Sequence, residues 1–171
     1  MLSKQSTYPK ERRMFAKDLA TLHDEYALRG RIDDTAPVTS SSEIVIDAPA
    51  QRVWEVLADL RGWQTWAPGF RVRALDAVEP GREFRWAQDG TPLRSRFAIV
   101  QPGRELSWTG SALGLYRAVD RMVLTAEGGR TRVTLQESFD GPLARLVFGE
   151  RKLRAAHETR LTALKSHVEN R

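Results

Sequence analysis

Six strand-like segments follow one another through the middle of this chain with only turns between them, and this pattern limits the fold more than any other feature. They are expected at residues 70–78, 82–88, 92–101, 105–111, 115–126 and 131–139, and the turn sequences between them include EPG, QDG, QPG and EGG. Turn signals every eight to twelve residues or so, without intervening helices, are typical of an antiparallel meander. From Pro142 the spacing changes to that of a long helix, whose apolar side carries Leu146, Leu153, Leu161, Leu164 and Val168.

A seventh strand is expected before the meander, at the start of the segment SEIVIDAPAQRVWEVLADLRGWQTWAP, residues 42–68. Residues 43–47 alternate polar and apolar, as a half-buried strand does. Pro49 fits the first turn of a helix, because its missing N–H would be unpaired there. Val53 and Leu57 follow on one apolar face, and two tryptophans, Trp63 and Trp66, lie in the turn beyond. The segment therefore predicts one strand and two short helical pieces.

An additional amphipathic helix is expected near the N-terminus. Phe15, Leu19, Leu22 and Tyr26 are spaced by three or four residues, and Gly30 marks the expected end of the helix. We expect the stripe to dock on the sheet of its own chain; a role as a dimer arm or as a lid stays open. The expected organisation is an N-terminal helical extension and linker at residues 1–41, followed by one domain at 42–171.

Residues 42–68 resemble the opening of the START-like, helix-grip superfamily, also called SRPBCC. Two later segments support the resemblance: ELSWTGSALGLYRAVDRMVL from residue 105 and GGRTRVTLQESFDGPLARL from residue 128. The similarity is greatest to the branch described as polyketide cyclase/dehydrase and lipid transport. It implies an α+β fold in which a curved, seven-stranded antiparallel sheet wraps around the long C-terminal helix and encloses an apolar cavity. It does not imply one reaction, because one fold can host unrelated functions.

Period-two alternation predicts which side chains face that cavity. Pairs such as Phe84 with Trp86, and Phe97 with Ile99, should share a face. Extending the alternation along each strand places polar residues on the same face. A mostly apolar pocket with a few convergent polar groups is the usual form of a small-molecule site, although any single residue in such a pattern is more often plain core. The expected ligand-binding residues are Trp66, Trp86, Ser95, Phe97, Trp108, Tyr116, Asp120, Met122 and Glu137.

Three of the residues near the cavity could serve in acid-base chemistry. Asp120 and Glu137 would be costly to bury without a partner, and strand parity directs the neighbouring arginines to the opposite face. His157 falls on or beside the apolar stripe of the C-terminal helix, and histidine is the residue type whose ordinary pKa lies closest to neutral pH. If the protein is an enzyme, Glu137, Asp120 and His157 are the catalytic candidates.

Composition excludes several other kinds of chemistry. Cysteine is absent and the three histidines are scattered, which argues against a disulfide framework, a thiolate site and a zinc site. No phosphate-binding glycine loop is present, so we expect neither a metal nor a cofactor.

The net charge of +5 does not point to nucleic acid. Acidic and basic residues balance between positions 43 and 140, whereas the last 31 residues carry seven basic and three acidic side chains. We interpret this excess as a solvated helix face, because the strands show no basic stripe with interleaved aromatic residues. No segment is long and apolar enough to span a bilayer, so we expect no integral membrane association and a cytoplasmic location.

Three functional hypotheses follow. The first is a carrier or binding protein for a hydrophobic or aromatic small molecule, such as a lipid or a polyketide-like compound. The second is a cofactor-free polyketide cyclase or dehydratase that uses acid-base residues of the same cavity. The third is an interaction protein, with the N-terminal helix as a homodimer arm or a lid.

Overall fold

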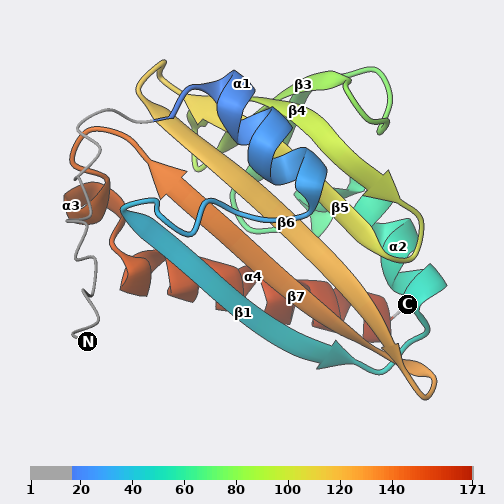
Figure 1. Cartoon of the computed structure of the whole chain (residues 1–171). Coiled ribbons are helices and arrows are strands. Elements are labelled where there is room, and N and C mark those ends of the chain that lie inside the picture. Colours follow the sequence, from blue (N-terminus) through green and yellow to red (C-terminus); the bar gives the residue numbers. More distant parts are fainter. Residues whose placement is uncertain (1–16, 171) are drawn as a thin grey trace, which may run out of the picture.

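Seven strands form one antiparallel sheet in the computed structural model, which describes residues 17–170 (Figure 1). The order across the sheet is β1-β7-β6-β5-β4-β3-β2, so β1 pairs with the last strand and the others form a meander. The strands are β1 (Val38–Ile46), β2 (Phe70–Leu75), β3 (Glu83–Gln88), β4 (Thr91–Gln101), β5 (Glu105–Ala112), β6 (Tyr116–Glu127) and β7 (Arg130–Asp140).

The helices divide between the two faces of this sheet. The long C-terminal helix α4 (Glu150–Glu169) lies along one face, and the N-terminal helical segment lies on the other (Figure 1). The other helices on the side of α4 are α2 (Ala50–Ala58), η3 (Gly62–Thr65) and α3 (Ala144–Phe148). This arrangement confirms the predicted helix-grip fold, including the two short helices after the first strand.

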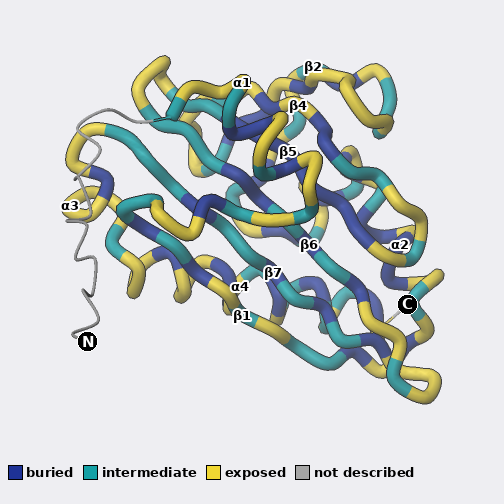
Figure 2. The backbone as a smooth tube through the Cα atoms, viewed as in Figure 1, coloured by how far each residue is buried: buried dark blue, intermediate teal, exposed yellow. Residues whose placement is uncertain are grey.

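The main hydrophobic core lies on the α4 side, which we call the inner face of the sheet. Its largest fully buried side chains include Trp63, Phe70, Phe84, Phe97 and Trp108. In strands such as β2, buried and exposed positions tend to alternate (Figure 2), because successive side chains of a strand point to opposite faces. In β5 residues 105–110 are all buried, since α4 covers one face of the sheet and the N-terminal segment covers the other. The inner face thus collects most of the large apolar residues of the chain.

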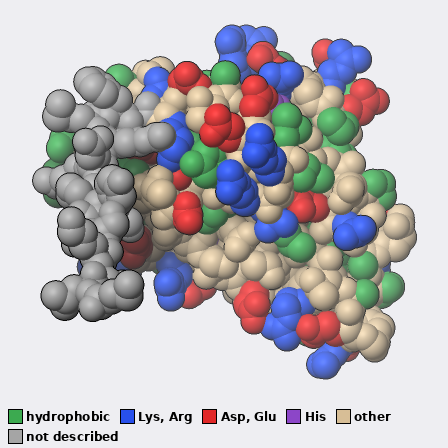
Figure 3. Space-filling model, in the orientation of Figure 1, with side chains coloured by type: hydrophobic (Ala, Val, Ile, Leu, Met, Phe, Trp, Pro, Cys, Tyr) green, Lys and Arg blue, Asp and Glu red, His purple; other side chains and the backbone are tan. Residues whose placement is uncertain are grey.

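The N-terminal segment docks on the outer face of its own chain, as expected. It runs through α1 (Leu19–Thr21), the π-helical η1 (Leu22–Tyr26) and η2 (Ala27–Arg29). Leu22 and Ala27 pack against Ala98 and Val119 of the sheet, and His23 Nδ1 lies 3.0 Å from Thr109 Oγ1. Phe15, the first residue of the predicted stripe, lies outside the described residues. On this side of the molecule, acidic and basic side chains are interspersed (Figure 3).

Some local predictions were wrong. The helix expected from Pro142 is interrupted at Gly149, between α3 and α4, and Leu146 lies exposed on α3 and not on the buried side of the long helix. The first strand begins at Val38 and not at Glu43, so residues that were assigned to a linker belong to the sheet. The register between β4 and β5 shifts between Phe97 and Ile99, and such a bulge adds a residue and reverses the facing of those that follow. Phe97 packs in the inner core, whereas the Ile99 side chain lies near Gly30 of the N-terminal segment. Phe97 and Ile99 therefore do not share a face.

No helix among residues 17–170 is long and apolar enough to cross a membrane.

Candidate functional site

One row of neighbouring side chains crosses the inner face and changes from polar to aromatic along its length. Ser40 on β1 is in register with Glu137 on β7, and Glu137 is in register with Asp120 on β6. The row continues through Trp108 on β5 to Phe97 on β4. Residues directly opposite one another on antiparallel strands share a face and lie close together. We call Ser40, Glu137 and Asp120 the polar row.

Helix α4 places two further side chains over the polar row. His157 Nε2 lies 3.0 Å from Glu137 Oε2, and Arg160 Nη1 donates to Asp120 Oδ2 at 3.3 Å. Positions three residues apart on a helix lie on the same side, which is why one helix supplies both contacts. His157 is 1% exposed and Asp120 is 5% exposed, so these groups interact away from bulk water.

This environment changes the proton affinity of Asp120. Burial, and after it the nearby negative charge of Glu137, raise the pKa of its carboxyl group, and Arg160 and His157 lower it; together these effects place the pKa at about 6. Desolvation disfavours the charged form of a carboxyl group, and a second carboxylate beside it has the same effect. Asp120 is therefore able to change its protonation state close to neutral pH.

Three buried side-chain atoms around the polar row lack a hydrogen-bond partner. They are Ser40 Oγ, Asp120 Oδ1 and His157 Nδ1, and no other such atom is found among the described residues. A buried polar atom without a partner costs about 1–3 kcal/mol. All three atoms lie around one row, so this part of the inner face has buried polar atoms that could still form hydrogen bonds.

The aromatic end of the row is densely packed. The rings of Phe84 and Phe97 are 4.5 Å apart, and those of Phe84 and Trp108 are 5.6 Å apart. The indole nitrogen of Trp86 donates to Ser95 Oγ at 3.0 Å. Four of the expected ligand-binding residues, Trp86, Phe97, Trp108 and Met122, thus belong to the hydrophobic core, and the Ser95 hydroxyl already has a partner there.

The two remaining expected aromatic residues are only half-buried. Tyr116 stacks on Phe139 with ring centres 5.3 Å apart. Trp66 packs on Trp63 at 5.1 Å and stacks on His167 of α4 at 6.1 Å. Both retain exposed surface on the inner side of the sheet.

Sequence reasoning missed two members of the site, Ser40 and Arg160. Ser40 lies in the TSSS run that was assigned to a linker, and extending the alternation of Ile44 and Ile46 backwards would have placed it inward. Arg160 follows His157 by three residues, so a helical projection would have paired the two. The cation beside Asp120 comes from the helix, whereas Arg121 pairs with Glu105 away from the inner face.

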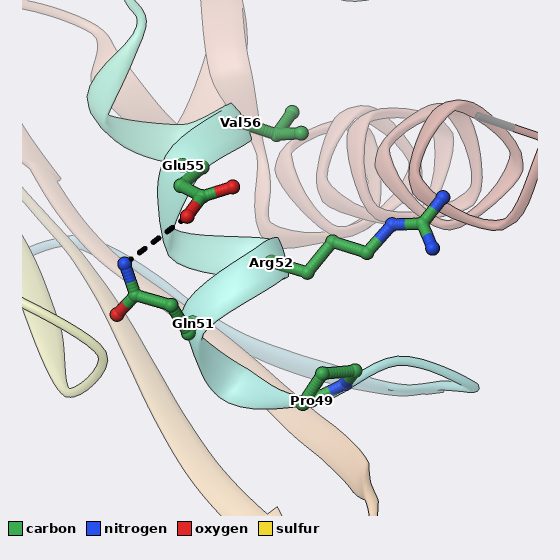
Figure 4. A pocket seen from close by; sticks show the side chains of 5 residues that line it. All are labelled: Pro49, Gln51, Arg52, Glu55 and Val56. Atoms are coloured by element: carbon green, nitrogen blue, oxygen red, sulfur yellow. Dashed lines mark hydrogen bonds between the residues drawn. The ribbon is translucent and has the colours of Figure 1, made fainter.

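A separate pocket of about 340 Å³ lies on the surface of α2, lined by Pro49, Gln51, Arg52, Glu55 and Val56 (Figure 4). Gln51 donates to Glu55 at 3.2 Å across one turn of the helix. Of these residues only Val56 is buried, and none belongs to the polar row. This pocket holds none of the expected site residues, and the buried, convergent groups of the polar row make the stronger candidate site.

Within the described part of the chain, no group of three or more His, Cys, Asp or Glu side chains is arranged to hold a metal ion. His157 and Glu137 contact each other through a hydrogen bond, and Asp120 lies opposite Glu137 on the neighbouring strand.

Solved structures share this fold at low sequence identity. The hypothetical protein jhp0584 from Helicobacter pylori is 14% identical with a TM-score of 0.69, covering 80% of this chain and 90% of its own. The Zhui aromatase/cyclase from Streptomyces sp. R1128 is 20% identical with a TM-score of 0.64, covering 78% and 94%. DynU16, from the dynemicin biosynthetic locus, is 22% identical with a TM-score of 0.63, covering 77% of this chain and 47% of its own. No curated protein matches this chain.

The family comparison covers most of the chain. The model described as polyketide cyclase / dehydrase and lipid transport matches residues 37–169, which span the sheet from β1 to β7 and the whole of α4. The matched range includes every member of the polar row as well as His157 and Arg160. The chain therefore belongs to the polyketide cyclase/dehydrase and lipid transport family of the START-like, or SRPBCC, superfamily.

Proposed function

We propose that the chain binds a hydrophobic or aromatic small molecule between the inner face of the sheet and α4, as a carrier or binding protein. The observation that carries the proposal is the set of three buried, unpartnered atoms, Ser40 Oγ, Asp120 Oδ1 and His157 Nδ1, next to an apolar and aromatic surface. The family description, which includes lipid transport, is consistent with it.

The chemistry of these atoms describes the ligand. A serine hydroxyl both donates and accepts, and a carboxyl group near its pKa can do either. Arg160 adds a cation to the same place. A ligand that carries carbonyl or hydroxyl oxygens on an apolar or aromatic frame would satisfy all of them, while its frame packs on half-buried surfaces such as Tyr116 and Trp66.

Native mass spectrometry of the protein, purified from its own host without denaturation, tests this proposal. We expect an additional mass from a bound apolar molecule, and the double variant Ser40→Ala/Asp120→Asn should lose most of it. Glu105→Gln, on the other side of the sheet, is the matched control and should retain the bound molecule. If the double variant carries as much of the bound molecule as Glu105→Gln does, the polar row does not hold the ligand.

Acid-base catalysis by a cyclase or dehydratase is the second candidate, and a specific contact favours it. Glu137 engages His157 Nε2, which leaves Nδ1 as the nitrogen able to exchange a proton with a substrate. A carboxylate that orients a histidine is a common device of general-base catalysis. The neighbouring Zhui structure is that of an aromatase/cyclase, although the likeness itself extends only to the fold.

The roles can be assigned without a cofactor. His157 would remove a proton from a carbon next to a carbonyl group, and Arg160 would stabilise the resulting enolate oxygen. The enolate carbon would attack a second carbonyl of the same chain, and protonated Asp120 would give its proton to the new alkoxide. In a dehydration, the Asp120 carboxylate would then remove the remaining proton from the carbon that attacked, and protonated His157 would give its proton to the departing hydroxyl. The hydroxyl leaves as water, and both side chains return to their starting protonation states.

Single-turnover assays with a poly-β-ketone substrate distinguish the two candidates. If the chain is an enzyme, Glu137→Gln and Asp120→Asn should each reduce the rate at least about a hundredfold while binding changes little. Full turnover in both variants would remove these residues from the mechanism.

A further inference from the structure

Six large apolar side chains lie exposed at one end of the molecule, on the β5–β6 hairpin and around α3. Their exposed fractions range from 41% to 75%. The hairpin and α3 lie at the same end of the sheet (Figure 1). We call this surface the leucine patch; its members are Leu113, Leu115, Leu143, Leu146, Val147 and Phe148.

Contacts beneath the patch join its two parts into one surface. Gly141, just before α3, packs so closely on the hairpin that an added Cβ would lie 2.9 Å from the Leu115 carbonyl oxygen. The Phe148 ring lies 5.0 Å from Phe139, and Phe139 stacks on Tyr116 at the base of the hairpin. The hairpin and α3 therefore present their apolar side chains together.

Backbone conformation argues that two of these leucines are not there for stability. Leu113 and Leu143 have φ values of 55° and 57°, in the left-handed region that suits glycine or asparagine and is costly for a bulky side chain. They are 64% and 70% exposed, so their side chains gain little from packing. A strained backbone that displays an apolar side chain to solvent is better explained by binding than by folding.

The charges around the patch indicate what it binds. Arg145, Arg151, Lys152 and Arg154 are exposed beside it on α3 and the first turns of α4, with Glu150 as the acidic residue among them. A symmetric contact between two copies would bring these cations together, because the same surface faces itself. Apolar side chains flanked by Lys and Arg match a surface that is apolar inside and negatively charged outside, which is the boundary of an anionic bilayer.

We propose that the leucine patch docks the protein onto membranes that contain anionic phospholipid, with the apolar side chains in the headgroup region and the flanking cations on the phosphates. This revises the interpretation of the basic C-terminal region as a merely solvated face. The docking is peripheral, and it goes beyond the proposed ligand binding. Because it is measured on vesicles without added ligand, its failure is distinguishable from failure of the proposed function.

Vesicle co-sedimentation of the full chain tests the proposal. We expect binding to mixed phosphatidylcholine–phosphatidylglycerol vesicles, much weaker binding to phosphatidylcholine alone, and a loss of binding as salt is added. The double variant Leu113→Asn/Leu143→Asn should reduce the partition coefficient at least about tenfold. Asparagine tolerates the left-handed backbone, so this variant should fold as well as the wild type. Leu28→Asn is the matched control, because Leu28 is 47% exposed and lies outside the patch.

A charge variant provides the second arm. Arg151→Gln/Lys152→Gln should weaken binding to the mixed vesicles roughly tenfold or more, since each cation near an anionic surface contributes about 1 kcal/mol. Wild-type protein that fails to sediment with the mixed vesicles would overturn the proposal, as would equal binding to both vesicle compositions. If the leucine double variant instead converts a dimer into a monomer in sedimentation velocity, the patch is an interface between copies and the proposal is wrong.

Discussion

Replacing Asp120 by asparagine should make the protein more stable, and the gain should depend on pH. The variant removes the ionisable group while its amide oxygen can still accept a hydrogen bond from Arg160. Burial, together with the nearby charge of Glu137, raises the pKa of Asp120 from 3.8 to about 6 in the folded protein. Between these values the folded protein retains a proton that the unfolded chain has released, so wild-type stability falls as the pH rises through this range.

The expected magnitude follows from the two pKa values. Their difference corresponds to about 3 kcal/mol of unfolding free energy once the pH lies well above 6. At about pH 4 most of this difference is absent. The stability gap between Asp120→Asn and wild type should therefore grow by about 2–3 kcal/mol in favour of the variant between about pH 4 and about pH 8. Any constant effect of the substitution cancels in this comparison.

Urea denaturation followed by tryptophan fluorescence measures the gap, since the chain has five tryptophans and Trp63 and Trp108 are fully buried. Asp76→Asn serves as the matched control, because Asp76 is exposed and its substitution should change stability little at either pH. A stability gap for Asp120→Asn that is the same at both pH values would refute the reasoning, because it would mean that the folded protein does not retain the Asp120 proton.

Two further substitutions test the packing of the inner face. Trp63→Ala should lower the free energy of unfolding by about 3–5 kcal/mol, because Trp63 is 0% exposed and its removal leaves a large cavity. Guanidinium denaturation measures this change, and a decrease in unfolding free energy below about 1 kcal/mol would contradict the prediction. Gly110→Ala would place a Cβ 2.9 Å from the Ser95 oxygen that binds the Trp86 indole. It should cost about 1–3 kcal/mol, and an unchanged midpoint of thermal unfolding would show that Ser95 moves freely.

The fold was largely predictable because its signals are local. Most strands of the meander alternate over their own length, and turn sequences such as QDG at Gly90 and QPG at Gly103 lie between strands, with both glycines at positive φ. The apolar residues of α4, which recur every three or four positions, are an equally local signal. The helix-grip architecture then follows from packing one helix on a single antiparallel sheet.

The site was less predictable because its contacts join distant parts of the chain. Alternation placed Asp120 and Glu137 on the inner face, but the cross-strand register that makes them neighbours comes from the pairing of β6 with β7. A helical projection places Arg160 on the same side of the helix as His157, but its pairing with Asp120 depends on how α4 packs on β6, which no sequence period predicts. The bulge after Phe97 has no sequence signal of its own, and it reversed the facing of Ile99.

The pairing of β1 with β7 has a consequence for how the protein is made. This pairing joins the first strand to the last and brings Ser40 beside Glu137, whereas the aromatic end of the row comes from neighbouring hairpins. Contacts between residues distant in sequence are slow to form. On the ribosome, His157 and Arg160 emerge after every strand, so a nascent chain can assemble its aromatic core before the polar row exists. We infer that the proposed ligand site forms only in the finished domain.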